Sequence, residues 1–210
     1  MARYTGPVCR LCRREGRKLY LKGQRCLSPR CAVEKRPYPP GQFGEHAQRR
    51  RRRTDYALQL RTKQALRTFY GILEGQMKRY VGQAERMPGV TGDNLLRLLE
   101  TRLDSVVYRA GFVSSRRQAR QLIGQRHFAV NGHVVTIASY RVRPGDVLTV
   151  REKSKNLPPI VEAVDVGARI APRWLEVDYE QRSIRILDLP AREDIEVPAD
   201  EQLVVEFYSR

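Results

Sequence analysis

The sequence predicts an α+β fold: a mostly helical first domain with a four-cysteine metal knuckle at its N-terminus, then a second domain of two helices on a small antiparallel sheet. Three observations support this prediction. Apolar residues recur at three- and four-residue spacing through much of residues 54–123, which is typical of amphipathic helices. The pair Asn131-Gly132 separates two short apolar runs, which indicates a hairpin. All four cysteines lie in two short-spaced pairs near the N-terminus.

The chain is strongly basic, with a net charge of +17 and a pI of about 10.3. Such an excess implies a polyanionic partner, either nucleic acid or an anionic membrane surface. No run of about eighteen or more apolar residues occurs, so the sequence predicts no membrane-spanning helix. The charge is uneven: residues 1–53 hold 16 Arg and Lys against 3 Asp and Glu, whereas residues 191–210 hold 2 against 6. We therefore expect residues 1–53 to bind the polyanion and residues 191–210 to face a different partner.

The cysteines are Cys9, Cys12, Cys26 and Cys31, with two residues inside the first pair and four inside the second. Two such pairs joined by a loop supply the tetrahedral thiolate set of a structural zinc site. We expect one structural Zn2+; an iron–sulfur cluster on the same thiolates is the alternative that the spacing leaves open. Disulfides or free thiols are less favoured, because the lack of an apolar signal region predicts a reducing, cytoplasmic compartment. The segment has few aliphatic residues, so metal binding would supply folding free energy.

Two basic stretches follow the cysteines. Residues 36–44 are rich in Pro and Gly and predict an extended strip that could follow a phosphate chain, or else a plain linker. Five consecutive arginines, Arg49 to Arg53, would become ordered on a polyanion, while nuclear targeting is the weaker alternative.

A long helix is predicted next, from an N-cap at Thr54 to about residue 84. Gly71, Gly75 and Gly82 would interrupt it. The loop at residues 87–92 is the natural boundary before the second domain.

In the second domain, apolar residues from Leu95 to Ala110 predict one helix that ends at Gly111. A shorter helix at residues 115–123 has Ser114 and Ser115 as candidate N-caps, and we expect its arginines on the side away from the core. An ordinary solvated helix face is the alternative for those arginines. The hairpin at residues 127–135 and a strand at 147–150 complete the predicted unit.

The tail predicts a strand pairing of residues 172–178 with 183–187, and Trp174 is expected in the core rather than as a base-stacking platform. Residues 203–210 are apolar and β-prone, so we expect them to dock on their own chain or on a protein neighbour. The acidic residues before and within the tail are expected to meet a basic protein. They are Glu193, Asp194, Glu196, Asp200 and Glu201.

Residues 94–155 resemble the S4 RNA-binding domain. The residues that carry this likeness are Arg102-Leu103-Asp104, Val107-Tyr108-Arg109, Phe112, Ser115-Arg116, Ala119-Arg120-Gln121-Leu122, Val130-Asn131-Gly132 and Pro144-Gly145-Asp146-Val147. Nearly the whole chain resembles the bacterial ribosomal protein S4 family. This wider likeness rests on residues 6–16, Pro39-Pro40-Gly41-Gln42, residues 56–61, Asn94-Leu95-Leu96 and residues 205–210. The four cysteines are similar to those of the metal-bearing branch of that family.

The resemblance implies a primary 16S rRNA-binding protein that recognises a multi-helix junction in the 5′ domain and nucleates 30S assembly. It also implies contact with ribosomal protein S5 and other small-subunit proteins and a role in translational accuracy. The protein would lie where mRNA enters and would be a monomer within the cytoplasmic ribosome. In that family the RNA-binding module is inserted into the first domain. The expected organisation is a basic metal-binding extension at 1–45, a helical domain at 46–93 completed by 196–210, and a second domain at 94–195 with the module at about 99–160.

The expected RNA contacts are basic and polar residues of both domains. They are Arg3, Arg10, Arg13, Arg14, Lys18, Lys22, Arg25, Lys35, Arg36, Arg49, Arg50, Arg51, Arg52, Arg53, Arg61, Lys63, Arg67, Arg109, Ser115, Arg116, Arg117, Arg120 and Gln121. On the module itself we expect Arg109, Arg116, Arg117, Arg120 and Gln121 to form the RNA-binding surface.

Two other classes of protein compete with this interpretation. Pseudouridine synthases carry the same module and an Arg-Leu-Asp motif, but here Asp104 lies in an apolar helix and no separate catalytic domain remains, so we expect no enzyme activity. A free-standing RNA chaperone that binds stalled ribosomal particles would share the module without needing the tail or the cysteines. About one copy per small subunit would indicate a component, and far fewer would indicate such a factor.

Overall fold

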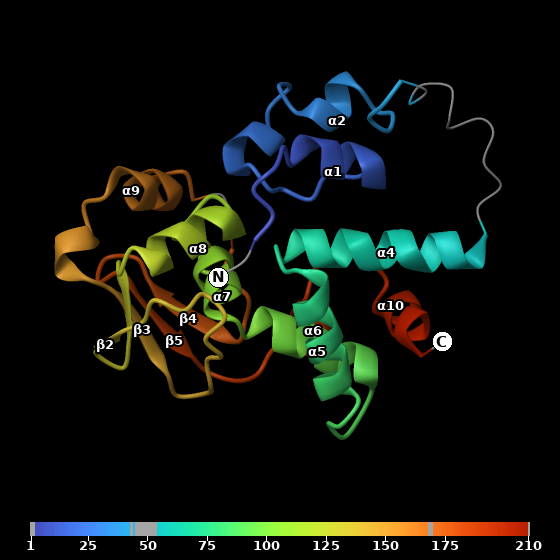
Figure 1. The fold of residues 1–210 in the computed structure, drawn as a ribbon. Helices are drawn as coiled ribbons and strands as arrows, with labels where there is room; N and C mark the ends of the chain where they lie inside the picture. The colour runs from blue at the N-terminus through green and yellow to red at the C-terminus, as the bar shows by residue number, and fades with distance from the viewer. Residues whose placement is uncertain (1–2, 43, 45–53, 168–169, 210) are drawn as a thin grey trace. The chain divides into compact units, whose positions relative to one another are not determined.

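The computed structural model describes residues 3–42, 44, 54–167 and 170–209 (Figure 1). The chain forms two compact units. The first unit contains residues 1–95 and 196–210, and the second contains residues 96–195. The second unit is therefore inserted into the first, and the chain's end belongs to the unit in which the chain begins.

The described part of the first unit is helical. Its elements are α1 (Cys9–Glu15), a 3-10 turn η1 (Gly23–Cys26), α2 (Ala32–Lys35), α4 (Asp55–Phe69), α5 (Glu74–Ala84), the start of α6 (Thr91–Glu100), and α10 (Glu201–Tyr208). The N-cap prediction for α4 is confirmed, since the Thr54 side chain accepts a hydrogen bond from the Ala57 amide. The predicted interruption is also confirmed at Gly71, whose φ of 64° lies in the left-handed region that favours glycine. Gly75 and Gly82 instead lie inside α5.

The C-terminal segment is a helix, so the expected β-prone tail is wrong in its secondary structure. The carboxylate of Asp200 caps α10 by accepting a hydrogen bond from the Gln202 amide at 2.9 Å. The helix packs against α4 and α5, with Val204 fully buried, and Figure 1 shows α10 beside α4. The tail thus docks on its own chain, as predicted, because its apolar residues also fit a helical period.

The second unit is built on one antiparallel sheet with strand order β2-β1-β3-β5-β4. The strands are β1 (Phe128–Val130), β2 (His133–Val134), β3 (Val147–Val150), β4 (Leu175–Asp178) and β5 (Ser183–Ile186). The hairpin prediction is confirmed: Val130 pairs with His133, and Asn131 and Gly132 both have positive φ, as this tight turn requires. The predicted pairing of β4 with β5 is confirmed as well.

The helices of this unit are the end of α6, then α7 (Leu103–Arg109), α8 (Arg116–Gly124) and α9 (Pro158–Asp165). The single helix expected up to Ala110 is wrong, because the chain becomes extended at Arg102 (ψ 141°). The Leu103 amide there donates to the Tyr140 carbonyl at 2.8 Å, and the Val142 amide donates to the Thr101 carbonyl at 3.0 Å. Hydrogen bonding to this distant loop replaces the helical pattern that the local sequence favours.

One apolar core joins α7 and α8 to the sheet. Phe112, Phe128, Leu148 and Ile184 are fully buried in it, and Trp174 is nearly so. The prediction that Trp174 belongs to the core is therefore confirmed. The antiparallel sheet with helices packed on it confirms the α+β fold class.

Phe128→Ala should destabilise the second unit by about 3–5 kcal/mol, because a fully buried aromatic ring is lost and the core refills only in part. Urea unfolding followed by fluorescence measures this, since the only tryptophan of the chain, Trp174, lies in the same core. Ile137→Ala is the control: its side chain is 55% exposed, and we expect a change within about 0.5 kcal/mol. Equal effects of the two substitutions would contradict this account of the core.

Candidate nucleic-acid interface and cysteine cluster

Helix α8 has a defined start and a defined inner face. Ser115 caps it by accepting a hydrogen bond from the Gln118 amide at 3.3 Å, which confirms the N-cap prediction. The Gln118 side chain in turn accepts hydrogen bonds from the amide and hydroxyl of Ser114, at 2.7 and 2.8 Å. The inner face is buried in the core. The outer face presents Arg117 and Arg120, both half-buried, and Gln121, which is exposed.

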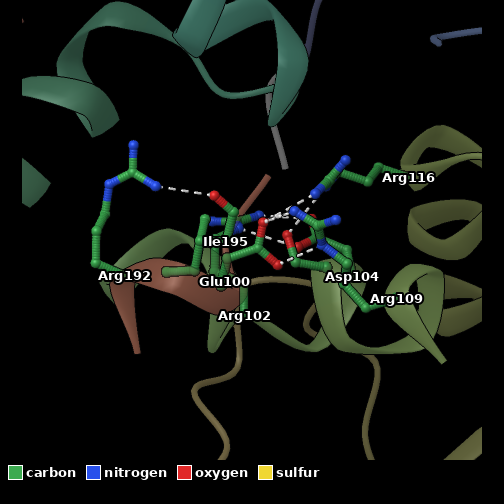
Figure 2. A network of polar contacts seen from close by, with 8 residues as sticks. Glu100, Arg102, Asp104, Arg109, Arg116, Arg192 and Ile195 are labelled. Carbon is green, nitrogen blue, oxygen red and sulfur yellow. Dashed lines mark hydrogen bonds and ion pairs between the residues drawn. The ribbon is translucent and has the colours of Figure 1, made fainter. Parts of the chain in front are cut away.

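The expected position of Arg116 on the outer face of α8 is wrong, because its side chain turns inward (Figure 2). Its Nη2 donates to Glu100 Oε1 at 3.1 Å, its Nε donates to Ser105 Oγ at 3.3 Å, and its guanidinium lies 4.4 Å from the centre of the Tyr108 ring. Arg109 is also mostly buried and donates twice to Glu100, at 2.9 and 2.8 Å. Both arginines bind a carboxylate of their own unit. Of the expected arginines of α8, only Arg117 and Arg120 lie on its outer face.

The Arg-Leu-Asp motif forms a closed ion pair. Arg102 donates to the two carboxylate oxygens of Asp104 at 3.0 and 2.6 Å, and both side chains are almost completely buried. The carboxylate that invited an enzymatic interpretation is therefore held by its neighbour inside the fold.

The basic residues expected to bind RNA in the first unit differ widely in exposure. Those that are exposed are Arg3, Arg10, Arg14, Lys22, Arg25, Lys35 and Arg36, and those that are half-buried are Arg13, Lys18, Arg61 and Arg67. Lys18 pairs with Glu34, and Arg61 pairs with Glu15 at 3.4 Å. Arg49, Arg50, Arg51, Arg52 and Arg53 lie outside the described residues.

Lys63, one of the residues expected to contact RNA, is buried. Its ammonium donates to Glu74 Oε1 at 2.7 Å and lies 4.4 Å from the centre of the Phe207 ring. The Tyr208 hydroxyl donates to the same oxygen of Glu74 at 2.6 Å, and Arg67 lies 3.6 Å from the other. The tail was predicted to dock, but the partner of its Tyr208, Glu74, which lies 134 residues earlier in the chain, was not predicted.

Arg13 holds the Pro/Gly segment in place. Its Nε donates to the carbonyls of Arg36 and Tyr38 at 3.2 and 3.0 Å, and its Nη2 donates to the Pro39 carbonyl at 3.4 Å. The guanidinium also lies 4.9 Å from the centre of the Tyr38 ring. A β-carbon on Gly44 would come within 1.9 Å of the Pro39 carbonyl oxygen, so only glycine fits there. These contacts favour a fixed strip over a plain linker.

The four cysteines are free; Cys12, Cys26 and Cys31 are buried, and Cys9 is partly so. Burial raises the pKa of the Cys12 thiol to about 11, and negative charge on the other three thiols acts in the same direction, while a backbone hydrogen bond with Leu19 opposes it. The Lys22 amide donates to Cys26 Sγ at 3.4 Å.

Within the described ranges, no three Cys, His, Asp or Glu side chains are arranged as a metal site. The expected four-cysteine knuckle is therefore not seen as a formed site. One of its thiols lies in the apolar cluster of the front segment, where Cys12 packs with Val8, Leu19, Leu21 and Ala65. Ala65 belongs to α4, so this segment buries apolar surface against the helical domain, which its own composition did not indicate.

The acidic residues expected to contact a protein are spread along the end of the chain. Glu193, Glu196 and Asp200 are exposed, Asp194 and Glu201 are half-buried, and Asp200 also caps α10. In the part of the chain that the structure describes, no helix combines the length and apolar content needed to cross a bilayer.

Lowering the pH should loosen α10 from α4. Burial alone would raise the pKa of Glu74, but hydrogen bonds from Lys63 and Tyr208 outweigh it and lower that pKa below its usual 4.5. The stabilisation is therefore present above about pH 4.5 and is lost as the pH falls through the lowered value. Amide hydrogen exchange of α10 across an acidic titration measures this loss.

Two substitutions control that titration. Glu74→Gln should remove the acid-dependent step, whereas Glu85→Gln, at an exposed carboxylate of the same unit, should retain it. Protection of α10 that does not depend on pH in the unmodified chain would contradict the assignment.

Comparisons with known proteins agree with this architecture. The family model described as "Ribosomal protein S4/S9 N-terminal domain" matches residues 3–100, and the model described as "S4 domain" matches residues 101–148. Small ribosomal subunit protein uS4 of Pelotomaculum thermopropionicum is 56% identical over 211 residues, and that of Thermus thermophilus is 57% identical over 212 residues, each alignment covering 100% of both chains. The protein of the same name from Heliobacterium modesticaldum is 56% identical over equal coverage. The chain belongs to the family of small ribosomal subunit protein uS4.

Proposed function

We propose that this protein is a structural component of the small ribosomal subunit that binds 16S rRNA. The observation that carries the proposal is its full-length similarity to proteins named small ribosomal subunit protein uS4. The family is structural and non-enzymatic, and the buried pairing of Asp104 with Arg102 accords with that role.

Recognition would rest on two physical effects. Exposed arginines and lysines neutralise phosphates and release counterions, so the affinity falls as salt is raised. Selectivity comes from shape, because A-form RNA hides its major groove and leaves junction geometry and the backbone to be read. Rigid presentation of the charges suits this kind of recognition. Helix α8 is fixed by its cap and its core face, and the strip at residues 36–39 is fixed by Arg13.

The finer role follows from the same chemistry. We propose that the protein is a primary binder that recognises a multi-helix junction in the 5′ domain and thereby nucleates 30S assembly. The acidic residues Glu193, Glu196 and Asp200 are exposed and suit a basic neighbour such as ribosomal protein S5, through which the protein would contribute to translational accuracy. We also propose that the protein lies near the site where mRNA enters the small subunit, in a cytoplasmic ribosome.

The chain should bind a 5′-domain junction of 16S rRNA more tightly than an RNA duplex of equal length, and the preference should persist as salt is raised. Arg117→Gln combined with Arg120→Gln should weaken binding and lower the salt slope by about two, one for each lost phosphate contact. A salt titration of both RNAs measures this.

Arg185→Gln is the control, since Arg185 lies on β5 with its side chain 63% exposed. It should leave both the preference and the slope unchanged. Equal affinities for junction and duplex, both collapsing with salt, would instead indicate a non-specific polyanion binder such as an RNA chaperone.

We also propose that the four cysteines hold one structural Zn2+. The donor set suits the ion: all four thiols are free, negative charge on Cys9, Cys26 and Cys31 contributes to the raised pKa of the Cys12 thiol, and the Lys22 amide donates to Cys26 Sγ. Bound zinc would stabilise the thiolate forms that burial otherwise disfavours and would brace the front segment. If all four cysteines bound it, the ion would be structural, and an iron–sulfur cluster is the alternative for the same cysteines.

Purified protein should contain one equivalent of zinc, and Cys26→Ala with Cys31→Ala should abolish binding and disorder the first unit's front segment. Elemental analysis, with amide exchange of residues 9–35, measures both. Trp174 fluorescence should remain unchanged, because the second unit has its own core. Iron with visible absorption would identify the cluster instead, and metal-free protein with an equally protected front segment would refute any metal.

A further inference from the structure

One buried carboxylate connects three helices of the second unit. Glu100 is the last residue of α6, Arg109 is the last of α7, and Arg116 is the first of α8. The Glu100 side chain is 1% exposed and binds both guanidiniums, with contacts at 2.8, 2.9 and 3.1 Å (Figure 2). Figure 2 shows these side chains converging on that carboxylate.

Stability alone is a weak reason for such an arrangement. Removing charges from water is unfavourable, and well-packed apolar side chains of similar volume often stabilise a core at least as well. What a bidentate arginine–carboxylate contact adds is geometry, because two parallel hydrogen bonds fix the orientation of both groups. Here the groups that are fixed are the ends of helices rather than points along them.

Arg116 depends on Glu100 for a further reason. A positive charge in the first turn of α8 faces the positive end of the helix dipole, which disfavours it. Glu100 offsets that repulsion, while Ser105 and the ring of Tyr108 hold the guanidinium from the side of α7. The first turn of α8 therefore has a single anchored position against α7.

Beyond that anchor, Arg117, Arg120 and Gln121 lie on the outer face of α8, while Ala119, Leu122 and Ile123 are buried in the core. Arg117 follows Arg116 directly, and Arg120 and Gln121 lie about one turn further on. Their placement depends on the direction and rotation of α8, both of which the anchored first turn sets. A buried carboxylate can in this way control where the outer-face arginines would meet phosphates.

We propose that Glu100 is a positioning residue for RNA recognition: by binding Arg109 and Arg116 it orients α8 so that Arg117 and Arg120 fit one RNA shape. This inference rests on the proposed rRNA-binding function. It assigns Arg109 and Arg116 to the support of the interface and separates them from the residues that meet phosphates.

The test is the ratio of duplex to junction dissociation constants, measured for the full chain with 5′-domain junction RNA and a duplex of equal length. Glu100→Asp keeps the charge but shortens the side chain, so it cannot reach both arginines as Glu100 does. We expect the ratio to fall about tenfold, which is the size of effect seen when a residue that orients a metal ligand is replaced. Duplex affinity and salt slope should stay as in the unmodified chain, because the outward charges remain.

Arg116→Lys is the second variant, since it keeps the charge and loses the fork that contacts Glu100 and Ser105. It should lower the ratio in the same way and speed amide exchange within α8. Glu176→Gln is the matched control: Glu176 pairs with Arg185 at 3.6 Å in the same unit, but both side chains are at least 60% exposed. Its ratio should equal that of the unmodified chain.

The outcomes are distinct. If the unmodified chain shows no junction preference, the proposed function fails. If it shows the preference and both variants retain it while their α8 amides exchange faster, Glu100 is only structural and the inference is overturned. A loss of affinity shared equally by junction and duplex would overturn it too, because positioning would then contribute nothing to shape selectivity.

Discussion

Two buried carboxylates, Glu100 and Asp104, determine how the second unit is put together. Asp104 holds Arg102 at the point where the chain leaves α6 and turns into α7, so the break between these helices is fixed by an ion pair. Glu100, at the end of α6, holds Arg109 and Arg116 and so joins the end of α7 to the start of α8. The attraction within a buried ion pair offsets the cost of desolvation only when its geometry is good. These ion pairs therefore restrict the positions of the helix ends that carry them.

The first unit uses the same principle in another place. Glu74 forms ion pairs with Lys63 and Arg67 and accepts a hydrogen bond from the Tyr208 hydroxyl. These contacts connect α10 to α4 and α5. The chain's end returns to its beginning after the inserted unit, so this contact closes a long loop in the chain. Closing this loop costs chain entropy, and the contacts of Glu74 together with the buried side chain of Val204 offset that cost.

Local patterns predicted most of the fold, and long-range polar contacts account for what they missed. The Asn131-Gly132 hairpin, the caps at Thr54 and Ser115, and the stop at Gly71 depend on neighbouring residues only, and all were found. The burial of Arg116 depends on a carboxylate sixteen residues earlier in the chain. Helical periodicity treats arginine as an outward residue, because a charged side chain inside a core is rare unless it is paired. The break at Arg102 and the burial of Lys63 were missed for a similar reason: the Tyr140 carbonyl that accepts from the Leu103 amide, and the Glu74 carboxylate that accepts from Lys63, lie in other parts of the chain.

The candidate interface shows how a strongly basic chain divides its charge between two roles. Arg102, Arg109, Arg116 and Lys63 bind carboxylates of their own unit, and Arg13 binds backbone carbonyls. These side chains hold helix ends and a proline-rich strip in fixed positions. Exposed residues of the first unit, such as Arg14, Lys35 and Arg36, carry the charge that faces outward. Net charge alone would attract any polyanion. Discrimination among RNA shapes requires charges at fixed positions. The buried arginines supply that rigidity because their contacts lie inside the fold and hold the surrounding elements in place.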